Sequence, residues 1–291
     1  MFYNIAVLYD FSEPSQKALT AAGLWAQAFK GSLEVIHVIP NSSVLETLSS
    51  DSVSENALQA LKTQIEKDIQ KQVPTSVTST VAILKGHTAN IILEALDAEK
   101  FDLVIMGTHG YSGISRLVMG SVAEKTVQHS PVPVLVVRGD TQTPPQKILV
   151  PVDFNDFAEE LFLHMFELSK ILNVTFDLIH VIPLSNTVQM FPAGIPNIAP
   201  VDTDLLCENA RAQMKTLAEK HPSLNVNLHT IIAPISEGIC TKAASLKSDM
   251  ILIQTHGYKG TQHFIMGSVA QQVVRYAPCP VLSFTPSSKS N

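Results

Sequence analysis

Short apolar runs and longer amphipathic stretches alternate along the chain. Stretches 14–30, 54–72 and 121–129 mix polar and apolar residues as helices do, and they end in polar or glycine residues. Five near-continuous apolar runs are typical of strands that are buried on both faces: NIAVLY (4–9), LEVIHVI (33–39), TSTVAIL (78–84), FDLVIM (101–106) and VPVLVV (132–137). This alternation predicts an α/β fold, a doubly wound sheet of five parallel strands with helices on both faces.

The whole pattern occurs twice. IAVLYDFSEPSQKAL (5–19) matches ILVPVDFNDFAEELF (148–162), and FDLVIMGTHGYSG (101–113) matches SDMILIQTHGYKG (248–260). The second copy is longer, and we place its extra residues in the proline-containing stretch 184–200. The polar, proline-containing segment 139–147 is typical of a linker. The sequence therefore predicts two tandem domains, 1–142 and 143–291.

A glycine-rich segment, GTHGYSGISRLVMGSV (107–122), directly follows the fourth apolar run. It has neither the GxxxxGK(S/T) pattern of a P-loop nor the GxGxxG pattern of a dinucleotide fold. Glycines let a ligand approach the backbone, and the N–H groups of Ser121 and Val122 would lie at the positive end of helix 121–129. The pattern favours an anion site, and a serine-capped glycine loop without a ligand is the alternative.

Each half resembles the universal stress protein family over essentially its whole length. The resemblance rests on the openings VLYDFSEPS and VPVDFND, the two IHV strands, the closing segments SPVPVLVV and APCPVLSF, and the spacing Gly-x2-Gly-x9-Gly-Ser. That spacing marks the ATP-binding branch of the family. It implies an adenine nucleotide as the ligand: ATP, with or without Mg²⁺, with ADP and AMP as alternatives.

The resemblance also implies roles for individual residues. Asp10 would bind the ribose hydroxyls or the adenine edge, and Val38 would hold the adenine through its backbone. The other implied residues of the first half are Leu8 and Tyr9 beside Asp10, Met106 and Gly107 at the base and ribose, and His109, Gly110, Gly120, Ser121 and Val122 at the phosphates. The matching positions of the second half are Pro151, Val152, Asp153, Val181, Ile253, Gln254, His256, Gly257, Gly267, Ser268 and Val269.

Two departures from the family pattern separate the halves. The first half has Leu8-Tyr9 where the second has the more family-like Pro151-Val152, and Gln254 replaces the first glycine of the motif. A glutamine is strained if that glycine needs positive φ, and it is tolerated if φ is ordinary. We therefore expect the first half to bind ATP more tightly than the second.

Several of these residues also have a structural interpretation. Asp10 and Asp153 lie where helices begin, with Ser12 as a candidate cap. His37 and His180 lie inside apolar strands and are predicted to be core histidines bonded to backbone. His109 and His256 are weak candidates for a catalytic base, because no carboxylate accompanies them in sequence.

Segments 131–138 and 278–284 each carry two prolines. Proline cannot donate to a central ladder, so these segments are predicted to be edge strands, and an open edge invites pairing. In the family this strand forms the dimer contact. The resemblance therefore implies that the two halves pair as an intrachain pseudo-dimer, and a further homodimer stays open.

Composition narrows the function classes. The net charge of −6 over 291 residues argues against a nucleic-acid surface, which needs clustered Lys and Arg. The three cysteines have no metal or redox spacing and are typical of reduced thiols in a cytosolic protein. The N-terminus has no basic leader, and no apolar run approaches the roughly 18 residues of a membrane span. We expect a cytoplasmic location, no membrane and no metal site.

The sequence favours an ATP-binding stress-response protein that acts as a sensor or regulator with little or no turnover. No nucleophile–base arrangement or P-loop lysine points to a catalytic residue. Two alternatives stay open. One is a slow adenine-nucleotide hydrolase, and the other is a binding module for another small molecule or a protein, with the stretch 184–200 as its contact surface.

Overall fold

The computed structural model describes residues 2–41, 55–96, 99–110, 119–139, 144–154, 158–183, 202–255 and 266–284. These residues form ten strands and eight helices, and the chain divides into two compact units. Unit 1 comprises the described residues of Met1–Pro144, Thr255–Gly267 and Pro280–Asn291, and unit 2 those of Pro145–Gln254 and Ser268–Cys279. The predicted domain boundary between residues 142 and 143 and the stretch 184–200 lie outside the described residues.

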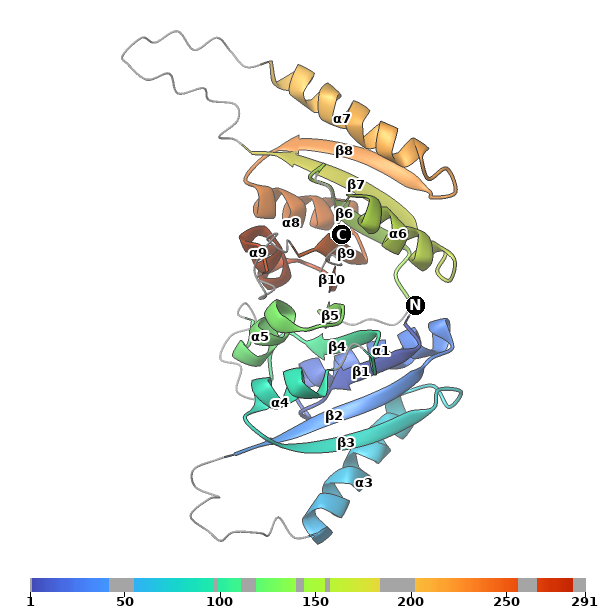
Figure 1. Cartoon of the computed structure of the whole chain (residues 1–291), viewed down its shortest axis with the longest axis vertical. Coiled ribbons are helices and arrows are strands. Elements are labelled where there is room, and N and C mark those ends of the chain that lie inside the picture. The colour runs from blue at the N-terminus through green and yellow to red at the C-terminus, as the bar shows by residue number, and fades with distance from the viewer. Residues whose placement is uncertain are drawn as a thin grey trace, which may run out of the picture. The chain divides into compact units, whose positions relative to one another are not determined.

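Unit 1 contains the five-stranded parallel sheet that the apolar runs predict. Its parallel strands are β1 (Asn4–Leu8), β2 (Ser32–Pro40), β3 (Ser79–Gly86), β4 (Leu103–Gly107) and β5 (Val134–Val137), in the order β3-β2-β1-β4-β5. Its helices are α1 (Glu13–Phe29), α3 (Glu55–Gln72), α4 (Thr88–Ala95) and α5 (Ser121–His129). The strand order reverses beside β1, which lies between β2 and β4 (Figure 1). The sequence predicted these helices except α4.

Helix α1 is fixed at its start by a serine cap. The Ser12 side chain accepts a hydrogen bond from the Ser15 N–H, and Pro14 occupies the first turn, where its missing N–H costs nothing. The helix buries Trp25 and Phe29, whose rings stack with centroids 5.4 Å apart. The cap fixes the start of α1 directly after the loop that carries Asp10.

Unit 2 repeats the parallel arrangement. Its strands are β6 (Lys147–Pro151), β7 (Thr175–Ile182), β8 (Val226–Ile232) and β9 (Met250–Gln254), in the order β9-β6-β7-β8. Its helices are α6 (Ala158–Ser169), α7 (Thr203–Glu219), α8 (Ile235–Leu246) and α9 (Ser268–Tyr276). The predicted alternation of strand and helix is therefore confirmed in both copies.

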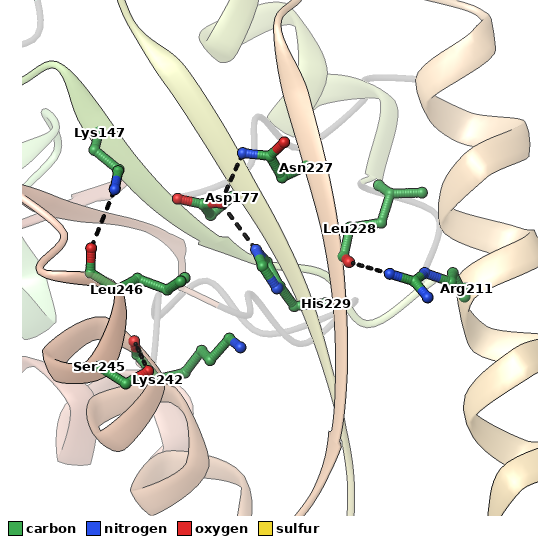
Figure 2. A network of polar contacts seen from close by, with 9 residues as sticks. All are labelled: Lys147, Asp177, Arg211, Asn227, Leu228, His229, Lys242, Ser245 and Leu246. Carbon is green, nitrogen blue, oxygen red and sulfur yellow. Dashed lines mark hydrogen bonds and ion pairs between the residues drawn. The ribbon is translucent and has the colours of Figure 1, made fainter.

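A buried carboxylate joins two strands of unit 2. Asp177 on β7 is 2% exposed, and Figure 2 shows Asn227 and His229 of β8 turned towards it. Asn227 Nδ2 donates to Asp177 Oδ1 at 3.1 Å, and His229 Nε2 lies 2.9 Å from the same oxygen. A buried carboxylate is costly without such partners, so this cluster favours the β7–β8 register in which Asp177 faces Asn227. These three residues therefore have a structural role, although none of them belongs to a recognisable motif.

The last strand of the chain belongs to unit 1. Strand β10 (Val281–Phe284) pairs antiparallel with β5, in a register that sets Leu282 opposite Leu135. Both leucines are 2% exposed. The prediction that the two proline-containing segments pair at their edges is confirmed for these strands. Unit 1 therefore contains a strand from the second sequence repeat.

Because β10 of the second repeat pairs with β5 of the first, we expect the two repeats to stay together after the linker is cut. When a protease site replaces residues 140–143 and is cleaved, we expect the two fragments to co-elute in size-exclusion chromatography, because β10 remains buried against β5. Leu282→Asp, which places a charge in that pairing, should release the fragments from each other. Fragments of the unsubstituted chain that separate as stable monomers would contradict the strand assignment.

Candidate functional site

A cavity of about 470 Å³ lies in unit 1 at the carboxyl ends of the strands. This is the place where ligands bind in open parallel sheets, beside the strand at which the order reverses. All the residues proposed for the first half line it: Leu8, Tyr9, Asp10, Val38, Met106, Gly107, His109, Gly110, Gly120, Ser121 and Val122. The cavity is also lined by residues that no motif indicated: Ser15, Ile36, His37, Pro40, Thr88, Ile92 and Ala123.

At one wall of the cavity, β1 ends at Leu8 while its neighbour β2 continues to Pro40. The Tyr9 N–H donates to the Ile36 carbonyl at 2.9 Å, and the Tyr9 carbonyl lies 2.7 Å from His37 Nδ1 instead of continuing the ladder. Polar backbone groups point to the same side at alternate residues of a strand, so Val38 directs its N–H and C=O as Ile36 does, beyond the end of β1. The N–H and C=O of Val38 are therefore placed where they could form hydrogen bonds with the edge of a ligand. His37 is bonded to backbone, as predicted, and it also lines the cavity.

Asp10 lies at the start of α1 and also lines the cavity, so its position is compatible with both interpretations that the sequence left open. Its Oδ1 accepts from the Ser12 N–H at 3.1 Å, and its own N–H donates to Ser15 Oγ at 3.3 Å, so the residue is tied to the start of α1. A Cβ atom on Gly110 would collide with Asp10 Oδ2. Glycine at 110 therefore allows the carboxylate to reach the cavity, which both residues line.

The start of α5 supplies the donors for an anion. Gly120 is the N-cap residue and makes no side-chain cap, and the first bond of the helix runs from the Glu124 N–H to the Gly120 carbonyl at 2.9 Å. The N–H groups of Ser121, Val122 and Ala123 consequently have no acceptor within the helix. All three residues line the cavity, at the positive end of the helix dipole. A bound anion would take the place of the absent cap.

Gly107 is required by packing and not by backbone conformation. Its φ is not among the positive values of the described residues, and a Cβ there would lie 2.7 Å from the backbone carbon of Pro14. The matching Gln254 also lacks a positive φ. The interpretation that this position needs positive φ and strains a glutamine is therefore wrong, and the alternative of an ordinary φ holds. What the family glycine allows in unit 1 is close contact between β4 and α1.

Tyr9, which departs from the family pattern, is bonded to a residue of α3. Its hydroxyl donates to Asp68 Oδ2 at 2.8 Å, and its side chain is 2% exposed. Burial, together with this bond, raises the pKa of the Tyr9 hydroxyl above its ordinary value. The side chain thus connects the end of β1 to α3, and Val152 at the matching position has no hydroxyl for such a bond.

Both repeats place a phenylalanine over the strand histidine. Phe11 and Phe154 adopt left-handed φ angles of 66° and 58°, and their rings lie 5.3 Å from His37 and 4.5 Å from His180. The left-handed region is disfavoured for a bulky residue, so the surrounding contacts must hold it. Sequence reasoning missed this arrangement, and the signal that could have revealed it is the Asp-Phe dipeptide shared by the two copies.

The second repeat keeps the framework and changes some of its polar groups. The Val152 N–H donates to the Ile179 carbonyl at 2.9 Å and His180 Nδ1 lies 2.7 Å from the Val152 carbonyl, as in the first repeat. Asp153 is exposed whereas Asp10 is half-buried. The remaining described positions lie at the ends of strands or the start of α9: Pro151, Val181, Ile253, Gln254, Gly267, Ser268 and Val269. His256 and Gly257 lie outside the described residues.

Fold and site together define an α/β protein with a ligand-sized cavity at the carboxyl ends of parallel strands and a helix N-terminus in its wall. The sequence matches the universal stress protein family over residues 1–138 and 145–284. The chain belongs to this family, as a tandem member with two such repeats. In the described part of the chain, no helix has the length and apolarity to cross a membrane.

Individual relatives agree with this assignment. A universal stress protein of Thermus aquaticus is 34% identical over 140 residues, which cover 47% of this chain and 100% of the relative. One of Mycolicibacterium smegmatis is 24% identical over 300 residues, covering 98% of this chain and 97% of the relative. The crystal structure of a universal stress protein from Archaeoglobus fulgidus has a TM-score of 0.68 at 20% identity, covering 99% of this chain and 98% of the other, and so shares the fold.

The different surroundings of the two glycines predict different effects of alanine. Gly107→Ala should lower the free energy of unfolding of the nucleotide-free chain by about 1–3 kcal/mol, because its Cβ meets the Pro14 backbone. Gly120→Ala is the matched control. Its backbone has an ordinary φ of −68° and the nearest atom is His109 Cα at 3.3 Å, so it should cost less than about 1 kcal/mol. Urea denaturation measures both, and equal stabilities would show that the contact with Pro14 is not what Gly107 provides.

Proposed function

We propose that the first repeat binds an adenine nucleotide in this cavity and that the chain acts as an ATP-binding stress-response sensor or regulator with little or no turnover. The proposal takes 1–142 and 143–291 as the two repeats, paired as a pseudo-dimer. The observation that carries it is the start of α5, where three backbone N–H groups without helical acceptors line the cavity. Such N–H groups are the donors that proteins commonly offer to phosphate.

The cavity has the size and the chemistry for this ligand. Its volume falls within the range of about 300–1,000 Å³ that small-molecule sites occupy. Leu8, Ile36 and Ile92 are buried apolar residues of its wall and suit the faces of a base. Val38 would read the edge of that base through its backbone, and the Asp10 carboxylate would accept from ribose hydroxyls. The start of α5 would hold the phosphates.

These groups support retention of the nucleotide more than its hydrolysis. Backbone N–H donors at the phosphate end stabilise a bound phosphate already in the ground state, and binding that is equally strong before and during reaction does not raise turnover. A protein that holds a nucleotide without consuming it can report the nucleotide level through the stability or shape of its binding repeat. This is why a sensor or regulator is proposed ahead of a hydrolase.

We propose that the second repeat binds nucleotide more weakly. Gln254 stands in place of Gly107, and the sequence has alanine at 158 where the first repeat has Ser15, whose hydroxyl accepts from the Asp10 N–H. Asp153 is exposed, whereas Asp10 is half-buried and lines the cavity. The Gly-Ser pair that we propose holds phosphate in the first repeat is kept as Gly267-Ser268. Affinity is therefore expected to be reduced and not abolished.

The two sites can be separated with matched variants. ATP at about 100 times its dissociation constant should stabilise the wild-type chain by roughly 2.7 kcal/mol. Gly120→Arg, which places a large side chain at the start of α5, should remove most of this gain, and Gly267→Arg should remove little. Thermal unfolding with and without ATP, ADP and AMP measures the effect. Full stabilisation of Gly120→Arg would contradict the phosphate role, and no stabilisation of wild type by any of the three nucleotides would favour the binding-module alternative.

A further inference from the structure

A threonine with no role so far lies beside the cavity. Thr108 directly follows β4, and its side chain is buried, with the residue 7% exposed. Its Oγ1 lies 2.8 Å from Nδ1 of His109, and His109 lines the cavity. The carbonyl of Thr108 accepts from the Gly120 N–H at 2.9 Å. One residue is thus bonded through its side chain to His109 and through its backbone to the start of α5.

The chemistry of the Thr108 hydroxyl and of His109 Nδ1 decides which of them donates the hydrogen bond between them. Among the described residues, the Thr108 hydroxyl has His109 Nδ1 as its hydrogen-bond partner. If Nδ1 carried a hydrogen, it would donate to the hydroxyl, and the hydroxyl's own hydrogen would have no acceptor among the residues that the structure describes. Burying a polar group in that way is unfavourable. The favoured arrangement has the Thr108 O–H donating to an unprotonated Nδ1.

We propose that Thr108 is a positioning residue that fixes His109 as the tautomer with its hydrogen on Nε2, so that His109 donates to the anionic part of the ligand. This inference rests on the nucleotide site proposed above. In a neutral ring, each nitrogen is either a donor or an acceptor. With Nδ1 occupied by Thr108, the polar atom that His109 can offer to the cavity is an N–H.

This assignment has a consequence for reactivity. In a neutral histidine with a hydrogen on Nε2, the lone pair of that nitrogen belongs to the aromatic ring, so Nε2 cannot remove a proton from a water molecule. Its other nitrogen already accepts from Thr108. His109 therefore adds a fourth N–H donor to the three at the start of α5 and holds the phosphate without acting as a base.

The matching threonine of the second repeat has a backbone acceptor for its hydroxyl. Thr255 is the matching threonine of the second repeat, and its hydroxyl donates to the carbonyl of Phe284 at 3.2 Å. The Thr255 N–H donates to the same carbonyl at 2.8 Å. Among the described residues, the Thr255 hydroxyl thus has a backbone carbonyl as its partner, and the Thr108 hydroxyl has the His109 ring.

The chain carries its own reference for the opposite tautomer. His37 Nδ1 lies 2.7 Å from the carbonyl of Tyr9, and His180 Nδ1 lies 2.7 Å from the carbonyl of Val152. A carbonyl only accepts, so Nδ1 must carry a hydrogen in both of these residues. A spectrum of the whole chain should therefore show both tautomers, with His109 differing from His37 and His180.

Long-range ¹H–¹⁵N spectra of the ligand-free full chain test the assignment at about pH 8.5, where a free imidazole is neutral. His109→Gln identifies the signals of His109. We expect the Nε2–H pattern in wild type and in Thr108→Ser, which keeps the hydroxyl. Thr108→Val keeps the shape without the hydroxyl and should lose that pattern. An Nδ1–H pattern in wild type, or an unchanged pattern in Thr108→Val, would overturn the inference whether or not nucleotide binds.

Calorimetry with ATP tests the role of the tautomer in binding. Thr108→Val should weaken ATP binding about tenfold, and Thr108→Ser should restore it, because only the hydroxyl differs in its bond to His109. Equal affinities of wild type and Thr108→Val would overturn the proposed role of the pair. If the spectra agree and the wild-type chain binds no nucleotide, the proposed function fails while the tautomer assignment holds.

Discussion

The site depends on backbone N–H groups at the start of α5 that their own helix cannot satisfy. Every helix begins with such groups, and a side chain can cap them, as Ser12 caps α1. At α5 the cap residue is Gly120, which has no side chain to offer, and the sheet directs these groups into a cavity. Three other features shape the same end of the sheet. Strand β1 ends before β2 does, and Gly107 allows close contact between β4 and α1. Gly110 leaves room for the Asp10 carboxylate.

The duplication shows which parts of the framework are structural. Both repeats keep the short first strand, the strand histidine bonded to its backbone and the left-handed phenylalanine over that histidine. These features shape the carboxyl end of the sheet whatever ligand is bound there. The polar groups differ more: the first repeat has Tyr9 bonded to Asp68 and Ser15 bonded to Asp10, and the second has the buried cluster around Asp177. Of these groups, Tyr9 and Ser15 line the cavity of the first repeat, whereas the Asp177 cluster joins β7 to β8.

Much of the fold and of the first site could be predicted from the sequence. Continuous apolar runs bounded by polar residues indicated the strands, and the glycine spacing indicated the cavity wall around Gly120. Helix α4 was missed because its eight residues give little periodicity, and with it Thr88 and Ile92 of the cavity. The reason for Gly107 and the bond between Thr108 and His109 depend on distances between elements, which spacing along the chain does not contain. The prolines beside β10 predicted an edge strand that pairs with its counterpart, but they did not predict that β10 belongs to unit 1.

The most direct test of the account is mass spectrometry of the folded, intact chain, stripped of co-purified small molecules and then titrated with ATP. The account predicts a species with one bound nucleotide at low concentrations of ATP, with a second appearing only at higher concentrations, because the two repeats share a framework and differ in their polar groups. A chain that binds no nucleotide at any concentration would contradict the central claim. Two nucleotides bound together from the lowest concentration would contradict the inequality of the sites.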